Sequence, residues 1–298
     1  MWSDPLLLAI FRRFPARDTI FKPSEGRPEA EYARASSGPF FRTFGKGLEE
    51  VAGKDVLDLG SGFGSQAVQY AEAGAASVRG VEVEVDKVIY SRRFAEKMGV
   101  ADIVSFVVGK GEELPLPSSS FDLVTMDDVL EHVIKPAAVL HECYRVLRPG
   151  GVLYAKFPPY YCVHGGSHFH GYMTRVPGLN LFFSTRALKS AATIRLDEMR
   201  VPWHQYLRDE STDKLWNLNG LTIRGLRRIL RGLPFKCRIE YIGFRDRRTS
   251  RQRAPESQTQ ITRKWPTPFY WAFEWPARAP FLQEIACSRV AVEAIKVW

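Results

Sequence analysis

The chain has 298 residues, 45% of them hydrophobic and 25% charged, which is ordinary for a globular protein. No apolar run approaches the roughly 20 residues that span a bilayer, and the first run, 6–11, lacks the flanking signals of a secretory leader. The four cysteines show no pair spacing, which fits a reducing compartment, so we expect a cytoplasmic protein. The net charge is −4 over residues 1–150 (18 Lys+Arg, 22 Asp+Glu) and +13 over residues 151–298 (24 against 11), so the basic half is either a solvated surface or a contact for an anionic partner.

Helices and loops are expected over residues 1–50, as an N-terminal helical cap before a sheet. From residue 55 the apolar pattern alternates between strand-like and helix-like segments. The strands are predicted at 55–59, 77–82, 103–109, 121–126 and 151–157, and the helices between them at 64–73, 86–98 and 133–147. Strands that alternate with helices of this length indicate a parallel sheet covered on both faces. Residues 51–157 are therefore expected to form the core.

The regular pattern stops after residue 157. Residues 158–220 are rich in Pro, Gly, His and aromatic residues and show no sustained period. Because long irregular segments in compact domains tend to be lids or binding loops, we expect a lid over the substrate, inserted after the fifth strand. A helix at 222–231 and strands at 235–244 and 286–297 would complete the sheet within residues 221–298, which also contain a basic loop at 245–268. The predicted fold is α/β, a doubly wound, seven-stranded, mostly parallel sheet of the Rossmann-like kind.

A glycine-rich turn follows the first predicted strand directly. Asp58 ends that strand, and Gly60, Ser61, Gly62, Phe63 and Gly64 form a G-x-G-x-G turn before a helix. A strand, a glycine turn and a helix N-terminus together hold nucleotides in doubly wound sheets, but the spacing differs from the dinucleotide G-x-G-x-x-G motif. The acid two residues before the first glycine suits an ammonium group better than a pyrophosphate, which points to adenosine with a charged amino-acid tail. Glu82, 24 positions further on, ends the second strand and could accept the hydrogens of both ribose hydroxyls; the alternative is a surface acid.

Three further motifs complete the pattern, at 107–115 (VVGKGEELP), 121–133 (FDLVTMDDVLEHV) and 145–151 (RVLRPGG). With them the chain resembles the class I S-adenosylmethionine-dependent methyltransferases, especially the group that includes the ubiquinone and menaquinone biosynthetic enzymes. The resemblance covers roughly residues 51–157. It implies S-adenosylmethionine as the cofactor and a methyltransferase of the Rossmann-like fold.

The same resemblance implies a place for each cofactor-binding residue. Asp58 and the loop of Gly60, Ser61, Gly62 and Gly64 would meet the methionine end, Glu82 the ribose, Gly111 and Glu112 the adenine edge, and Asp127 the other side of the methionine. Lys110 stands where the family commonly has an aspartate. Because an ammonium cannot accept the adenine amino hydrogen, either the backbone and Glu112 hold the adenine or that contact is missing.

Two groups of residues could activate a nucleophile for methyl transfer. In the first, Asp128, Glu131 and His132 would share one face if a helix starts at Asp128, and such a set can hold a divalent cation. The alternative is a helix capping box formed by Asp128 and Glu131, which we prefer, so no metal is expected. Catalytic contributions from Asp128 and His132 remain candidates.

The second group is a cluster of histidines at 164, 168 and 170 in the expected lid. An imidazole is the natural base for a hydroxyl nucleophile near neutral pH. His168 follows a flexible Gly-Gly-Ser segment and is the preferred base or substrate contact, against the alternative of a purely structural loop.

These features favour an enzyme of small-molecule biosynthesis that transfers a methyl group to an aromatic or polyketide-like hydroxyl. Three alternatives stay open. One is C- or N-methylation of a phosphate-bearing or prenyl substrate, one is a basic protein that docks on RNA or a membrane, and one is a methyltransferase fold that transfers no methyl group. RNA is less favoured because the basic run 245–253 contains no aromatic residue to stack on bases. Peripheral membrane contact stays open because Arg12 and Arg13 follow the apolar run 6–11.

Overall fold

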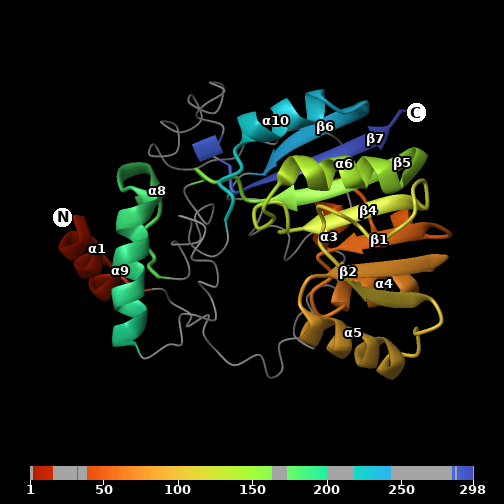
Figure 1. Ribbon diagram of the computed structural model, residues 1–298, viewed down its shortest axis with the longest axis horizontal. Helices are drawn as coiled ribbons and strands as arrows, with labels where there is room; N and C mark the ends of the chain where they lie inside the picture. The colour runs from red at the N-terminus through yellow and green to blue at the C-terminus, as the bar shows by residue number, and fades with distance from the viewer. Residues whose placement is uncertain are drawn as a thin grey trace.

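A seven-stranded sheet runs through the protein in the order β3-β2-β1-β4-β5-β7-β6 (Figure 1). The computed structural model describes residues 3–15, 32, 39–162, 173–199, 218–242, 284–285 and 287–297. The strand β7 is antiparallel to β5 and β6, and the other neighbouring pairs are parallel. The strands are β1 (Asp55–Leu59), β2 (Ser77–Glu82), β3 (Val104–Val108), β4 (Phe121–Asp127), β5 (Leu147–Phe157), β6 (Phe235–Ile242) and β7 (Arg289–Lys296). The predicted α/β fold class is confirmed.

The strand β5 begins earlier than its sequence predicts. We expected it from residue 151, because Arg148–Gly151 looked like a turn. Instead Leu147 already pairs with Phe121, and the register shifts before Val152 pairs with Leu123. Gly150, at φ +79°, lies in this irregular stretch. A β-bulge thus accommodates the Pro-Gly-Gly sequence inside the strand rather than before it.

Two layers of helices cover the sheet. On one face α6 (Pro136–Val146) and α10 (Ile223–Arg231) pack on an apolar cluster that includes Leu57 and Val292. On the other face α3 (Pro39–Arg42), α4 (Ser65–Glu72), α5 (Val85–Lys97) and the 3-10 helix η1 (Leu48–Val51) cover a second cluster. Both faces of the central strands are therefore buried, as the near-continuous apolar strand sequences require.

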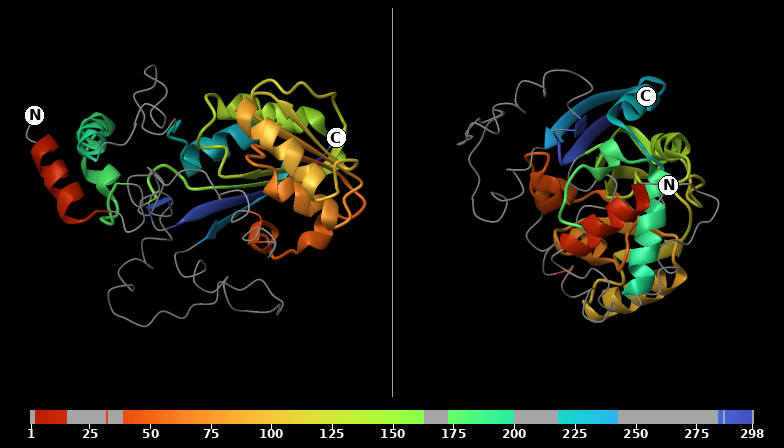
Figure 2. Two further views of the ribbon diagram at one scale, coloured as in Figure 1. Left: turned by 90° about the horizontal axis from the view of Figure 1, so that it is seen from below. Right: turned by 90° about the vertical axis from the view of Figure 1, so that its left-hand side faces the viewer.

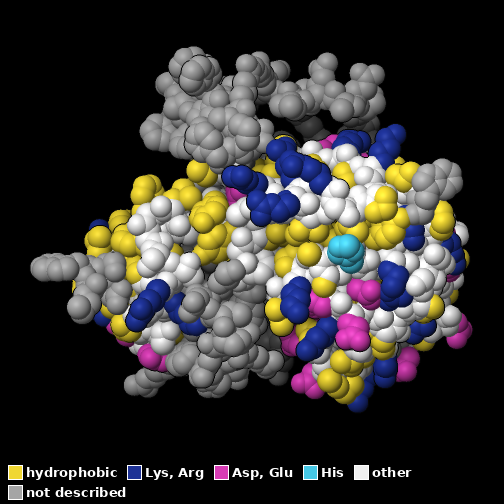
Figure 3. All heavy atoms as spheres, turned by 45° about the horizontal axis from the view of Figure 1, so that its top comes forward, with side chains coloured by type: hydrophobic (Ala, Val, Ile, Leu, Met, Phe, Trp, Pro, Cys, Tyr) yellow, Lys and Arg dark blue, Asp and Glu magenta, His cyan; other side chains and the backbone are white. Residues whose placement is uncertain are grey.

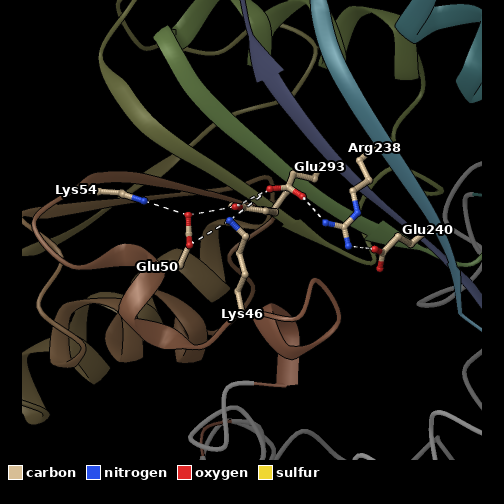
Figure 4. A network of polar contacts seen from close by, with 7 residues as sticks. Lys46, Glu50, Lys54, Arg238, Glu240 and Glu293 are labelled. Carbon is tan, nitrogen blue, oxygen red and sulfur yellow. Dashed lines mark hydrogen bonds and ion pairs between the residues drawn. The ribbon is translucent and has the colours of Figure 1, made fainter. Parts of the chain in front are cut away.

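A polar network fastens residues 46–54 to the far half of the sheet (Figure 4). Glu50 forms ion pairs with Lys46 (3.2 Å) and Lys54 (3.1 Å). Lys46 also reaches Glu293 on β7 (3.4 Å), and Glu293 pairs in turn with Arg238 on β6 (3.7 Å). Each pair is partly exposed and contributes modestly, but together they connect the segment before β1 with the last two strands.

A separate helical lobe lies beyond the carboxyl ends of the parallel strands (Figures 1 and 2). It consists of α1 (Ser3–Arg13), α8 (Leu179–Phe182) and α9 (Thr185–Glu198), which enclose their own apolar cluster. In that cluster Leu7 and Phe11 of α1 meet Leu188 and Leu196 of α9. We predicted no regular structure over 158–220, and that was wrong for α9. Its apolar residues do recur at helical spacing, and Ser184, whose hydroxyl accepts the Ala187 N–H, is a normal N-cap.

The helices of the expected cap at 1–50 pack in two different parts of the protein. α1 packs with α9 in the lobe, whereas α3 and η1 pack on the sheet. The basic loop at 245–268 lies outside the described residues. Within the parts of the chain that the structure describes, no helix is both long and apolar enough to cross a membrane.

Candidate cofactor and active site

The glycine turn after β1 is tightly enclosed on one side and open on the other. Gly60, Gly62 and Gly64 all have positive φ angles (76°, 55° and 81°). A Cβ at Gly60 would lie 2.4 Å from Cγ2 of Val129, whereas a Cβ at Gly62 would meet no atom within 4 Å. The backbone at Gly62 can therefore be approached closely by a ligand, while Gly60 provides room for the segment after β4.

The carboxylate of Glu82 is fixed at the end of β2 beside this turn. Its Oε2 accepts the Gly62 N–H (3.0 Å), and its Oε1 accepts the N–H groups of Val83 (2.9 Å) and Glu84 (3.1 Å). Each carboxylate oxygen has two acceptor sites, so Glu82 keeps acceptor capacity after these bonds. It is held in one orientation next to the open glycine.

Asp58 is buried at the end of β1, with 2% of its surface exposed. Its Oδ1 accepts a hydrogen bond from the Thr125 hydroxyl (3.2 Å), and among the described residues its Oδ2 has no hydrogen-bond partner. Burial raises the pKa of Asp58 to about 7, and the charges of Asp127 and Glu82 add to the rise. A buried carboxylate without a partner is costly, so this site suits a cationic ligand.

Asp127 ends β4 and is the third acid of this group. Its Oδ1 lies 3.0 Å from Nζ of Lys156 on β5, and its Oδ2 accepts a hydrogen bond from Gln66 (3.4 Å). The Lys156 ammonium also lies 5.4 Å from the ring centroid of Phe40. No local sequence pattern points to Lys156, because its position next to Asp127 depends on the pairing of β4 with β5.

Asp58, Glu82 and Asp127 form an acidic, glycine-lined cradle that fits S-adenosylmethionine, whose tail carries an ammonium and whose sulfur is a sulfonium. The open backbone at Gly62 leaves room for a ligand, and the Asp58 oxygen without a partner among the described residues can accept a hydrogen bond from a cation. A dinucleotide pyrophosphate would be repelled by three neighbouring acids.

The residues after β4 do not form the helix on which two predictions depended. Residues 128–134 form a turn, and α6 begins only at Pro136, with Lys135 as an N-cap that makes no side-chain cap bond. The predicted capping box of Asp128 and Glu131 was therefore wrong. The shared helical face for Asp128, Glu131 and His132 is likewise missing.

Each acid of this turn has its own environment instead. Asp128 adopts φ +57° and pairs with Arg289 at the start of β7. The Glu131 side chain is buried, and its Oε1 lies 3.8 Å from Nε2 of His132. Burial raises the pKa of Glu131 to about 8, so its carboxyl is mostly protonated at pH 7. Within the described ranges, no group of three or more His, Cys, Asp and Glu side chains could hold a metal ion.

The two ends of the insertion meet at this turn. Asn219, just before α10, donates from Nδ2 to the carbonyls of Leu130 (2.6 Å) and Val133 (2.7 Å). The carboxylate of Glu284 accepts the N–H groups of Tyr161 (3.4 Å) and Ile223 (3.2 Å), at the start and the end of the insertion. Within the described residues, these bonds join both ends of the insertion to the core near the turn that carries Glu131. Sequence reasoning missed Asn219 and Glu284, since neither belongs to a recognisable motif.

Other predicted site residues lie near the cradle or outside the described part of the chain. Glu112 Oε1 accepts the N–H groups of Ile134 (2.7 Å) and Lys135 (3.2 Å), so this carboxylate holds the approach to α6. Its contact with adenine, and that of Gly111, stay predictions. His164, His168 and His170 lie outside the described residues, and the role of His168 also stays a prediction.

The fold and the cradle define a Rossmann-like domain whose acidic, glycine-lined site suits an adenosyl ligand with a cationic tail. Residues 57–155 match the family model described as "Methyltransferase domain". The chain is similar to a "Ubiquinone biosynthesis O-methyltransferase" of Neisseria meningitidis serogroup A, at 33% identity over 36% of this chain and 45% of the relative. It is also similar to a "27-O-demethylrifamycin SV methyltransferase" of Amycolatopsis mediterranei, at 37% identity over 34% of this chain and 38% of the relative.

A solved S-adenosylmethionine-dependent methyltransferase from Mesorhizobium loti shares the fold, with a TM-score of 0.54 at 18% identity over 89% of this chain and 99% of that one. The chain spans less than half the length of these two curated relatives. Residues 57–155 are thus similar in sequence to methyltransferase domains, and the chain shares its fold with a solved methyltransferase. The likeness to the curated relatives lies in about a third of the chain, so it does not describe the lobe or the insertion.

Proposed function

We propose that the protein is an S-adenosylmethionine-dependent methyltransferase that acts on a small molecule, in the first place on an aromatic or polyketide-like hydroxyl. The observation that carries the proposal is the acidic cradle, in which a buried Asp58 oxygen has no partner among the described residues and the Gly62 backbone is open. The names of the two curated relatives support a hydroxyl acceptor. One is called an O-methyltransferase, and the other is named for a substrate that lacks an O-methyl group.

The residues of the cradle divide the binding of the cofactor among themselves. Asp58, with Gly60, Ser61, Gly62 and Gly64, would hold the methionine end, and the one remaining acceptor site of Glu82, on Oε2, would take a ribose hydroxyl. When bound, S-adenosylmethionine supplies an electrophilic methyl group on a positively charged sulfur. The protein must then align the acceptor with it and exclude water.

The acceptor hydroxyl needs a base, because its oxygen has to lose a proton as it forms the new bond to carbon. Glu131 is poorly suited at pH 7, since burial keeps its carboxyl mostly protonated. We therefore keep an imidazole nitrogen of His168 as the proposed proton acceptor. His132, next to Glu131, is the second candidate, and Asp128 has the role of positioning this turn through its pair with Arg289.

Calorimetry tests the cofactor part of the proposal. We expect S-adenosylmethionine and S-adenosylhomocysteine to bind to the purified chain, and we expect Asp58→Asn to weaken S-adenosylmethionine binding strongly. Asp102→Asn, an exposed acid outside the cradle, serves as the matched control and should bind normally. If neither ligand binds at millimolar concentration, the proposed function is wrong.

Turnover on a panel of phenols and macrolide-like hydroxyl compounds, followed as S-adenosylhomocysteine release, tests the acceptor class. With an acceptor in hand, His168→Ala should lower turnover by about 10²–10⁴-fold, and a chelator should leave the rate unchanged. Cofactor binding with turnover only on carbon or nitrogen acceptors would contradict the O-methylation part alone.

A further inference from the structure

Helix α10 presents an unusually basic surface. It has nine residues and contains four arginines but no acid. Its apolar side chains Ile223, Leu226 and Leu230 are buried against the sheet. The arginines therefore gather on the opposite side, which faces away from the core, and they are Arg224, Arg227, Arg228 and Arg231.

Three of these arginines are exposed and unpaired in the described part of the chain. Arg227 lies over the ring of Tyr241, with its guanidinium 5.7 Å from the centroid. Arg224, Arg228 and Arg231 are exposed and form no ion pair with any residue in the described ranges. A cation in the last turn is favoured by the helix dipole, which accounts for Arg228 and Arg231 but not for Arg224 at the second position of the helix.

An exposed aromatic side chain lies on α8, in the helical lobe. Phe182 on α8 is 81% exposed. Asn180 of α8 donates to the Tyr160 carbonyl (2.9 Å), and the Tyr160 N–H donates to the carbonyl of Leu221 (3.0 Å), two residues before α10. These bonds tie α8 to the start of the arginine helix. Figure 3 shows Lys and Arg side chains gathered in the upper middle of one face, with hydrophobic atoms on the lobe beside them.

We propose that this face, made of the α10 arginines and Phe182, docks on a membrane surface that contains anionic lipids. Cationic side chains beside an exposed phenyl ring are the combination that binds such a surface, since the arginines meet the headgroups and the ring enters the boundary with the acyl chains. Arg224 and Arg231 are about 10 Å apart along the helix, a distance that a few lipid headgroups cover.

A nucleic acid fits the same face less well. Binding to single strands uses aromatic rings interleaved with the basic residues, and α10 contains no aromatic residue. Phe182, the most exposed aromatic ring in the described part of the chain, lies on a different element. The proposal goes beyond methyl transfer and does not depend on it, because the docking face lies outside the cofactor cradle.

Vesicle sedimentation of the full chain tests the proposal. We expect binding to vesicles of phosphatidylcholine with 30% phosphatidylglycerol and little binding to pure phosphatidylcholine, with the difference falling as salt is added. Arg224→Gln with Arg228→Gln should weaken binding by about 30-fold, at roughly fivefold for each arginine near an anionic surface. Phe182→Ser should weaken it further without changing the salt dependence.

The matched control removes two cations that are also four residues apart, from a helix on the other face of the sheet. Arg93 and Lys97 are exposed on α5. The double variant Arg93→Gln with Lys97→Gln should change vesicle binding by less than about twofold. S-adenosylhomocysteine binding is measured on every variant and shows that each is folded. A variant that binds this ligand but not the vesicles has lost docking alone, so the two proposals are tested separately. If no variant binds the ligand, circular dichroism melting shows whether each is folded.

Three outcomes would overturn the proposal. The first is equal binding to both kinds of vesicle, and the second is an equal loss in the α5 control, which would make the effect one of total charge. The third is displacement of the protein from anionic vesicles by single-stranded RNA with tighter affinity than for the vesicles, which would identify a nucleic acid as the preferred partner.

Discussion

Replacing Asp58 with asparagine should remove one contribution to the pH dependence of the free energy of unfolding. In the wild-type protein, ionising this buried carboxyl lowers stability. Burial, together with Asp127 and Glu82, raises the pKa of Asp58 from 3.8 to about 7. Because the folded state then holds this proton more tightly than the unfolded chain, stability falls as the pH rises from about 4 to 7, and it levels off above 7. At about 1.36 kcal/mol per unit, the free energy of unfolding should fall by about 2.5 kcal/mol from this group between pH 5 and pH 8.

Urea unfolding of wild-type protein and Asp58→Asn at pH 5, 6, 7 and 8 measures this contribution. The asparagine variant has its own offset, because an amide N–H group replaces the carboxylate oxygen that has no partner. The offset cancels when each protein is compared with itself across pH. Asp102→Asn should keep the wild-type pH dependence, since Asp102 is exposed.

The same carboxyl should control cofactor affinity. A cationic ligand binds the ionised form, so the affinity for S-adenosylmethionine should rise up to tenfold per pH unit between about pH 5.5 and 7 and then become constant. Asp58→Asn should bind weakly at every pH without this rise. Parallel stability curves for the wild type and the variant, or cofactor affinity independent of pH in the wild type, would refute the assignment of this pKa to Asp58.

Three other predictions follow from the geometry of the site. Gly60→Ala should destabilise the protein by about 2–4 kcal/mol, because its Cβ would overlap Val129 in a positive-φ backbone, whereas Gly62→Ala should cost about 1 kcal/mol. Thermal melting of the two variants measures the difference, and equal losses of stability would contradict the packing argument. Asp128→Gly should be more stable than Asp128→Ala by about 1 kcal/mol, since both lose the pair with Arg289 but only glycine tolerates φ +57° without strain; an alanine variant of equal stability in urea would count against strain at this position. Asn219→Asp keeps the acceptor for the Leu221 N–H but loses both donors to the 130–133 turn. It should therefore lower the free energy of unfolding by about 1–3 kcal/mol and speed amide hydrogen exchange in that turn. Unchanged exchange there would show that the turn does not depend on Asn219.

The local sequence was sufficient for the central architecture. β1 and β2 were predicted at the residues where they occur, and α4 and α5 within one residue at each end, because a buried parallel strand and an amphipathic helix leave unmistakable apolar patterns. The cradle was also readable, since Asp58, the glycine turn and Glu82 all lie at the ends of adjacent strands whose order follows from the βαβ rule.

Sequence alone misjudged the segment after β4. The spacing of Asp128 and Glu131 fits a capping box, but the chain turns at a positive-φ Asp128 instead, and Arg289 and Asn219 hold that turn from positions about 90 or more residues further along the chain. Such contacts leave no periodic signal near the residues that they position. The same holds for Lys156, which meets Asp127 only through the register of β4 and β5.

By itself, then, the sequence determined the alternation of strands and helices, the glycine turn and the identity of the acids around it, because these depend on neighbours within one βαβ unit. Tertiary structure decided which residues surround those acids. It brought α1 against α9 across about 180 residues of chain, placed Arg289 beside Asp128, and left Asp58 buried with an oxygen that has no partner among the described residues. Burial and pairing of this kind arise when distant segments pack together, and the local pattern of any one segment cannot encode them.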